Sequence, residues 1–83
     1  MRARRLRFDD GALLILRIEA ERAGEGYVER NADLLQRAAR VLEGLIRPND
    51  LLGRAGPHEI AVLLPGTSWS PARRQAERYV RAL

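Results

Sequence analysis

Arginine is the residue type that can do most of the chemistry in this sequence. It supplies all 15 basic side chains, and the chain has neither lysine nor cysteine. A guanidinium group stays charged and pairs as a fork with phosphates and carboxylates, but it cannot replace a Schiff-base lysine or a thiolate. Thiol catalysis, disulfides and cysteine-held metals are therefore excluded. The arginine side chains are instead suited to binding an anionic partner.

His58 is the only histidine, and no second histidine or cysteine is present to share a metal with it. Metal sites of that kind need several such ligands, so we interpret His58 as a turn residue and expect no metal and no cofactor. Glu59 is interpreted as a hairpin residue rather than a catalytic carboxylate. Trp69 is interpreted as packing on the helix that follows it, with a binding hot spot as the alternative.

The positive charge is unevenly spread along the chain. Residues 1–8 hold four arginines and no acid, 9–31 are net negative, and 32–83 are net positive. The net charge of +4 could attract an anionic ligand or nucleic acid, but it is too small to establish either. We interpret residues 1–8 as a solvated basic arm. The longest apolar run, 12–16, is too short to cross a membrane and no secretory signal is recognisable, so we expect a cytoplasmic protein.

Apolar spacing predicts five elements in residues 9–83, which we interpret as one domain. The apolar stretch 12–18, interrupted only by Arg17, predicts a strand covered on both faces. A long helix is predicted from Val28 or Ala32 to Ile46, with Asn31 as a plausible N-cap. Two short strands, 51–54 and 60–64, follow as a hairpin, and a last helix begins with Ser70 as cap and Pro71 in its first position.

The order strand, helix, strand, strand, helix predicts an α+β sandwich of ferredoxin-like type, with two helices on one face of a small sheet. The strand at 12–18 is the most apolar and is predicted to be central. A fold of this type adds another strand beside it, and the chain ends before such a strand. We therefore expect an open sheet edge there, through which a second copy or a partner protein could pair.

The stretch RPNDLLGRAGPHEIAVLLPGT at 47–67, followed by Ala76-Glu77-Arg78, resembles the GGDEF domain of diguanylate cyclases. The ungapped match covers about residues 34–83, and the strand at 12–18 resembles the family's first strand more loosely. The resemblance implies a nucleotidyl-cyclase-like sandwich that lacks the C-terminal strands. It also implies a part in bacterial cyclic di-GMP signalling.

The family's catalytic signature is degenerate here. It aligns with Gly56, Pro57, His58, Glu59 and Ile60. Pro57 replaces a glycine and lacks a backbone N–H, and His58 replaces an acid that would suit magnesium far better. The family's metal-binding aspartate falls at Arg17, or at Glu19 if the alignment slips by two residues. The family's phosphate-binding lysine belongs to the absent C-terminal part. We therefore predict no catalytic residues and no enzyme.

The family's inhibitory product-binding site is better preserved. Its Arg-x-x-Asp stands five residues before the signature, as Arg47 and Asp50 do here, and its further arginine aligns with Arg78. The resemblance implies that the two arginines hold guanine and phosphate of cyclic di-GMP, while Asp50 accepts hydrogen bonds from a guanine edge. The alternative is a surface ion pair between Arg47 and Asp50, with Arg78 merely solvated.

The sequence thus predicts a catalytically inactive, GGDEF-like regulatory module that binds cyclic di-GMP. The alternative is an interaction or dimerisation module without nucleotide, and an active diguanylate cyclase ranks third. A homodimer or partner protein at the open sheet edge is expected, and membrane and nucleic acid are not.

Overall fold

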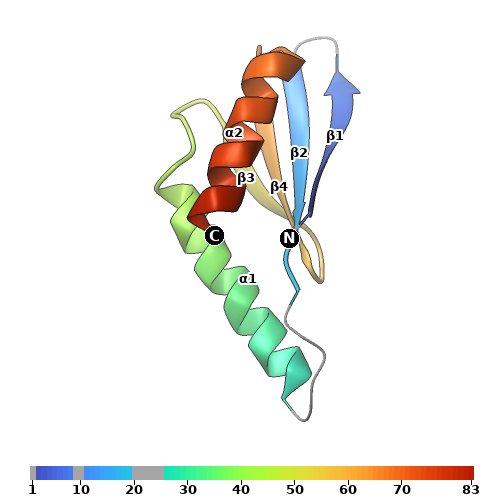
Figure 1. The fold of residues 1–83 in the computed structure, drawn as a ribbon, viewed down its shortest axis with the longest axis vertical. Coiled ribbons are helices and arrows are strands. Elements are labelled where there is room, and N and C mark those ends of the chain that lie inside the picture. Colours follow the sequence, from blue (N-terminus) through green and yellow to red (C-terminus); the bar gives the residue numbers. More distant parts are fainter. Residues whose placement is uncertain (1, 9–10, 20–25) are drawn as a thin grey trace.

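The computed structural model describes residues 2–8, 11–19 and 26–83. Its elements, in chain order, are β1 (Arg2–Phe8), β2 (Gly11–Arg17), α1 (Tyr27–Glu43), β3 (Leu51–Gly56), β4 (Glu59–Pro65) and α2 (Trp69–Ala82). They form a small α+β fold of two helices and an open antiparallel sheet (Figure 1). Strands β2, β4 and β3 adjoin in that order, and β1 extends the sheet beside β2.

β2 is an internal strand, as its apolar sequence predicts. It runs antiparallel to β4, with Leu14 opposite Val62 and Leu16 opposite Ile60. On its other side it runs antiparallel to β1, with Leu6 opposite Leu13. Backbone groups on both of its edges are therefore paired within the sheet.

The expectation of a solvated arm at residues 1–8 is wrong for residues 2–8, which form β1. The expected open edge beside 12–18 is wrong for the same reason, because β1 fills it. An apolar strand with an unpaired edge leaves backbone N–H and C=O groups without partners, and a segment only two residues away can fold back and pair with them. Among the residues described, the edge strands of the sheet are instead β1 and β3.

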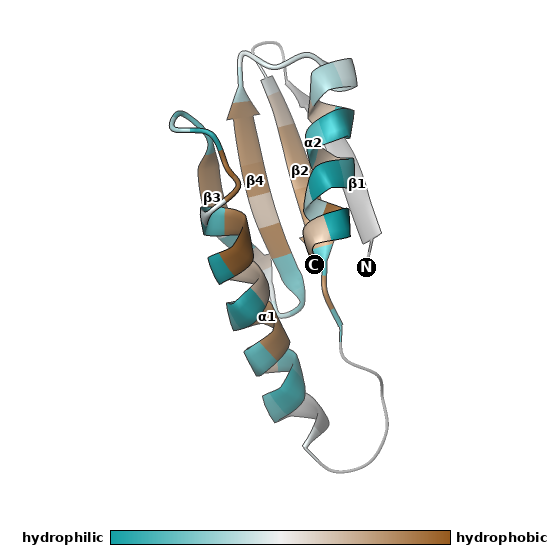
Figure 2. Cartoon of the chain, turned by 60° about the vertical axis from the view of Figure 1, so that its left-hand side comes forward, coloured by the Kyte–Doolittle hydropathy of each residue, from teal (hydrophilic) through white to brown (hydrophobic). Residues whose placement is uncertain are grey.

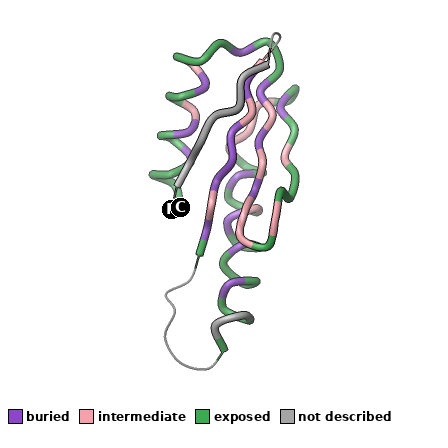
Figure 3. Tube along the Cα trace, turned by 90° about the vertical axis from the view of Figure 1, so that its right-hand side faces the viewer, coloured by how far each residue is buried: buried purple, intermediate pink, exposed green. Residues whose placement is uncertain are grey.

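Both helices pack on one face of the sheet (Figure 2). Strand side chains alternate between faces, so the even-numbered residues of β2 and β4 share the helix side. The core contains these strand residues, three residues of α1 and three of α2: Ala12, Leu14, Leu16, Ile60, Val62, Leu64, Leu35, Ala38, Leu42, Ala72, Ala76 and Tyr79. Figure 3 shows the buried residues along the strands and on the inner sides of the helices.

The other face of the sheet carries the odd-numbered strand residues and is covered by neither described helix. Leu13, Ala61 and Leu63 on this face are half-buried, and Ile15 is buried. Leu51 at the β3 edge is 61 % exposed. This face is therefore apolar without being part of the main core.

The helix ends differ from the predicted ones. α1 begins at Tyr27, after Gly26, whose φ of 81° is easy only for glycine. Asn31 therefore lies inside the helix and is not its N-cap. α1 ends at Glu43, three residues before the predicted end. α2 begins earlier than predicted, with Ser68 as N-cap, and Pro71 is tolerated in the first turn because the N–H groups there have no helical partner.

Part of each predicted apolar stripe is exposed. On α1, Leu34 and Val41 are 36 % and 40 % exposed. Val80 on α2 and Leu83, directly after it, are each 39 % exposed. Trp69 is 38 % exposed, so it is only partly packed. The apolar periodicity thus predicts the buried face of each helix correctly but includes residues at its margin that the structure exposes.

Candidate functional site

Arg47 and Asp50 form an ion pair in the loop that joins α1 to β3. The Arg47 Nε–H donates to Asp50 Oδ2 at 2.9 Å, and Nη2–H donates to Oδ1, also at 2.9 Å. The backbone N–H of Arg47 donates to Oδ2 at 3.0 Å as well. In return, the Asp50 backbone N–H donates to the Arg47 carbonyl at 3.0 Å, which closes the turn. One residue therefore supplies three hydrogen bonds to a single carboxylate.

The two partners of this pair are very unequally exposed. The Asp50 side chain is 1 % exposed, whereas the Arg47 side chain is 41 % exposed. The hydrogen bonds to Asp50 raise the pKa of Arg47 above its ordinary value, although burial acts in the opposite direction. The pair is thus a buried acid covered by a half-exposed cation, and not the surface ion pair of the alternative interpretation.

Thr67 ties the ion pair to the end of β4. The Arg47 Nη2–H donates to Thr67 Oγ1 at 2.7 Å, and the Thr67 hydroxyl donates to the Pro65 carbonyl at 3.2 Å. Sequence reasoning missed Thr67, because a Pro-Gly-Thr run signals only the end of a strand. Its contact with Arg47 fixes the guanidinium between two segments that are 20 residues apart.

The burial of Asp50 changes what it can do. Its carboxylate is closed to solvent and already accepts three hydrogen bonds. A guanine edge could reach it only if the Arg47 side chain moved away. In this structure Asp50 holds Arg47 in place, and Arg47 presents its remaining exposed surface outward.

Arg78 lies on α2 and is exposed. It has no hydrogen bond or ion pair with the residues described. Its neighbour Tyr79 is fully buried, with a hydroxyl that has no hydrogen-bond partner in the described part of the chain. Burial and the charge of Asp50 raise the pKa of that hydroxyl above 10.0, and the charges of Arg47 and Arg78 lower it. The charges of Arg47, Asp50 and Arg78 therefore all contribute to the pKa of this hydroxyl.

The residues that the resemblance aligns with the catalytic signature, 56–60, lie in the β3–β4 hairpin. Gly56 ends β3 next to a β-bulge, Pro57 and His58 form the turn, and Ile60 is buried in the core. The His58 carbonyl accepts a hydrogen bond from the Ile18 N–H at 2.7 Å, and its ring Nδ1 is hydrogen-bonded to the Asn31 amide. The interpretation of His58 as a turn residue is confirmed. Hydrogen bonds join this turn to Ile18, directly after β2, and to Asn31 of α1.

Arg17, at the end of β2, lies where the resemblance would require a metal ligand. It pairs with Glu19 at 3.4 Å on the surface and stands opposite Glu59 in the sheet. A fixed cation beside these carboxylates opposes the binding of magnesium. Within residues 2–8, 11–19 and 26–83, no group of three histidine, cysteine or acidic side chains could hold a metal ion.

Comparison with known proteins found no matching family model, no matching curated protein and no matching solved structure. Neither helix of the described part of the chain is long and apolar enough to cross a membrane.

Proposed function

We propose that the chain is a non-catalytic GGDEF-like regulatory domain that binds cyclic di-GMP in the cytoplasm. The element order from β2 to α2, with both helices on one face of the sheet, supports a ferredoxin-like, nucleotidyl-cyclase-like domain. In such a domain the last strand pairs antiparallel with the first, and β1 occupies that place here. The arrangement of sheet and helices thus fits the resemblance. The difference is that an N-terminal strand, β1, takes the position that the C-terminal strand has in such a domain.

The fixed guanidinium of Arg47 is the observation that carries this proposal. Asp50 and Thr67 hold it from the inside, and the side chain is still 41 % exposed. Nε and Nη2 are engaged by these two residues, so Nη1 is the nitrogen left to donate to a phosphate oxygen or a guanine acceptor. A guanidinium that is already oriented loses less conformational freedom on binding. Arg78 supplies a second exposed cation that acts on the same Tyr79 hydroxyl. Asp50 is then a positioning residue and not a direct ligand.

The same proposal excludes cyclase activity on chemical grounds. Phosphoryl transfer between nucleotides requires metal ions that neutralise the developing charge. Arg17 stands at the metal position, and the turn residues Pro57 and His58 replace a glycine and an acid. A GTP-turnover assay with magnesium is therefore expected to yield no product.

Calorimetric titration with cyclic di-GMP, GTP and inorganic phosphate tests the binding. We expect binding of cyclic di-GMP in the micromolar range and weaker heats for the other two. Arg78→Ala and Arg47→Lys should each weaken it about tenfold. Alanine removes a cation, and lysine keeps the charge but cannot be held by Asp50 and Thr67 and still offer a further donor to the ligand. Arg73→Ala removes an exposed arginine of α2 that is paired with Glu77, and should leave binding unchanged.

Two results would contradict the proposal. The first is the absence of heat at saturating cyclic di-GMP. The second is an equal loss of affinity in Arg73→Ala and Arg78→Ala, which would indicate general charge attraction rather than a site.

An interaction module without nucleotide remains the second candidate, favoured by the helix-free face of the sheet. Leu51 is 61 % exposed there beside the half-buried Leu13 and Leu63, and no described strand pairs with the outer edge of β3. Such an apolar surface and edge suit a second copy or a partner protein. Sedimentation at rising protein concentration tests self-association, and Leu51→Arg should reduce it. A monomer at all concentrations would contradict the homodimer.

A further inference from the structure

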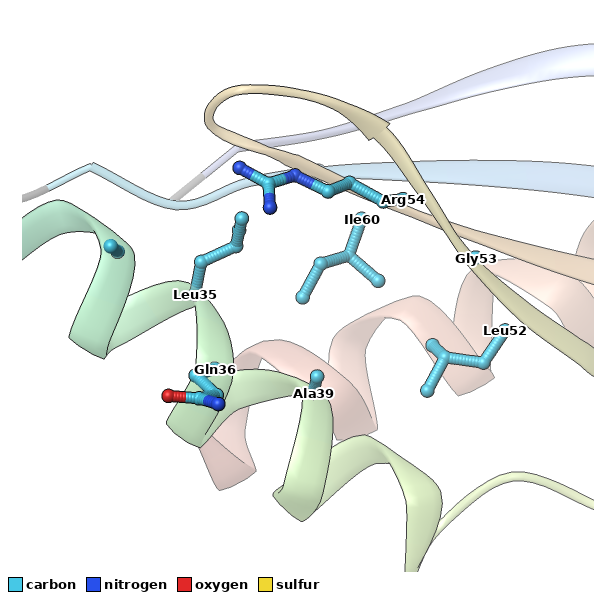
Figure 4. A pocket seen from close by; sticks show the side chains of 8 residues that line it. Leu35, Gln36, Ala39, Leu52, Gly53, Arg54 and Ile60 are labelled. Atoms are coloured by element: carbon cyan, nitrogen blue, oxygen red, sulfur yellow. The ribbon is translucent and has the colours of Figure 1, made fainter.

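A cavity of about 490 Å³ lies between α1 and the β3–β4 hairpin. Leu35 and Ala39 line it from α1, Leu52 and Gly53 from β3, and Ile60 from β4 (Figure 4). Small-molecule sites in proteins fall in the range of about 300–1,000 Å³ and are mostly apolar. This cavity is large enough for a small organic molecule, and its walls suit an apolar one.

Two polar side chains accompany these apolar walls. Arg54 extends from β3 across the cavity toward α1, and the Gln36 amide lies on the α1 side (Figure 4). The Arg54 Nε–H donates to the Gly56 carbonyl at 3.3 Å, which steadies the side chain. No carboxylate of the described residues pairs with this guanidinium, so its two terminal nitrogens are available to an anion. The cavity thus combines an apolar interior with one cation at its rim.

We propose that this cavity binds a small monocarboxylic acid with an apolar body. The body lies against Leu35, Ala39 and Ile60, and the carboxylate pairs with the terminal nitrogens of Arg54. A charge-assisted pair with arginine fixes the orientation of the acid, while burial of the body supplies most of the affinity. The site uses none of Arg47, Asp50 and Arg78, so it stands or falls independently of cyclic di-GMP binding.

The test compares hydrocinnamate with its neutral amide, hydrocinnamide, by nitrogen–proton correlation NMR. Both share the same apolar body, so the difference between them isolates the charge. We expect hydrocinnamate to shift the amide signals of Leu52, Gly53 and Ala39, and to bind about five- to tenfold more tightly than the amide. The phenyl ring should shift these signals through its ring current.

Two variants separate the cation from the cavity. Arg54→Gln should lower the affinity for hydrocinnamate to that for hydrocinnamide. The affinity for hydrocinnamide itself should not change. Ala39→Phe fills the cavity and should abolish the binding of both. Arg37→Gln, an exposed arginine of α1 outside the cavity, and Ala82→Phe, an exposed position on α2, are the matched controls. Thermal melts show whether each variant is folded.

The proposal is overturned by any of three results. The first is that hydrocinnamate at millimolar concentration shifts no amide signal of the cavity residues. The second is that hydrocinnamate and hydrocinnamide bind with equal affinity. The third is an equal loss of affinity for hydrocinnamate in Arg54→Gln and Arg37→Gln, which would mean that the net charge of the protein, and not Arg54, accounts for the binding.

Discussion

Replacing Asp50 with alanine removes the acceptor of three hydrogen bonds from Arg47. Breaking a fully buried ion pair costs about 3–5 kcal/mol. Here only the acid is buried, at 1 % side-chain exposure, and Arg47 at 41 % can recover water contacts. We therefore expect Asp50→Ala to lower the free energy of unfolding by about 2–3 kcal/mol. For a domain of this size that corresponds to a fall in Tm of about 10–20 °C.

Urea denaturation followed by circular dichroism measures this loss, with Asp33→Ala as control. Asp33 is an exposed acid on α1, and its replacement should change the free energy of unfolding by less than about 0.5 kcal/mol. Combining Asp50→Ala with Arg47→Ala completes a double-mutant cycle, and the pair should show a coupling energy of about 1–3 kcal/mol. Equal changes in the free energy of unfolding for Asp50→Ala and Asp33→Ala would refute the reasoning, because the buried carboxylate would then stabilise the fold no more than an exposed one.

Three further changes probe the fold around the candidate site. Tyr79→Phe should alter stability at neutral pH by less than about 1 kcal/mol, because none of the described residues forms a hydrogen bond with the hydroxyl. Burial raises the pKa of Tyr79 above 10.0, so the wild type should lose stability as the pH rises beyond about 10, and Tyr79→Phe should remove that part of the loss. Gly11→Ala should cost about 1–3 kcal/mol, because a Cβ there would lie 2.7 Å from a carbonyl oxygen of β4, whereas Gly53→Ala meets no atom within 4 Å and should be nearly neutral. Asn31→Ala removes the buried amide that holds His58 and should cost about 1–2 kcal/mol, with faster amide exchange in the hairpin turn.

Urea titrations of each variant at pH 7 supply these values, and a series from pH 8 to pH 11 supplies the Tyr79 comparison. An unchanged pH dependence in Tyr79→Phe would contradict the assigned burial of that hydroxyl. Equal costs of Gly11→Ala and Gly53→Ala would contradict the close approach of β2 to β4. Unchanged exchange in Asn31→Ala would contradict the link between α1 and the turn.

Five of the six elements could be predicted from local patterns, because apolar runs and turn residues mark them in the sequence. Their ends could not. The left-handed Gly26 moves the start of α1 to Tyr27, and the cap at Ser68 moves the start of α2 forward. The first residue of each helix depends on the direction from which the chain enters it. That direction is set by the tertiary structure and cannot be derived from single residues.

β1 could not be predicted because its sequence signals charge and not burial. Segment 2–8 holds four arginines, a composition that indicates a solvated basic arm rather than a strand. An edge strand requires only backbone pairing on one side, and a charged sequence can satisfy that. The signal that could have revealed it lies in its neighbour: an internal apolar strand such as β2 needs partners on both edges.

The candidate site was only partly predictable. The spacing of Arg47 and Asp50 made a pair between them foreseeable as an alternative, but not the burial of the acid beneath the cation. Thr67 lies 20 residues away in the sequence and enters only through the fold. The availability of Asp50 for a ligand depends on this burial, and composition or spacing contains no information about it.

Strand β1 also has a consequence for how copies of the chain behave toward one another. Without it, β2, with the sequence GALLILR, would present an apolar edge, and such edges template the growth of aggregates. β1 replaces that edge with one whose sequence holds four arginines, and like charges on facing edges repel. A shortened chain that begins at Gly11 should therefore precipitate or form fibrils where the full chain stays dispersed, because its arginine-rich gatekeeper is gone.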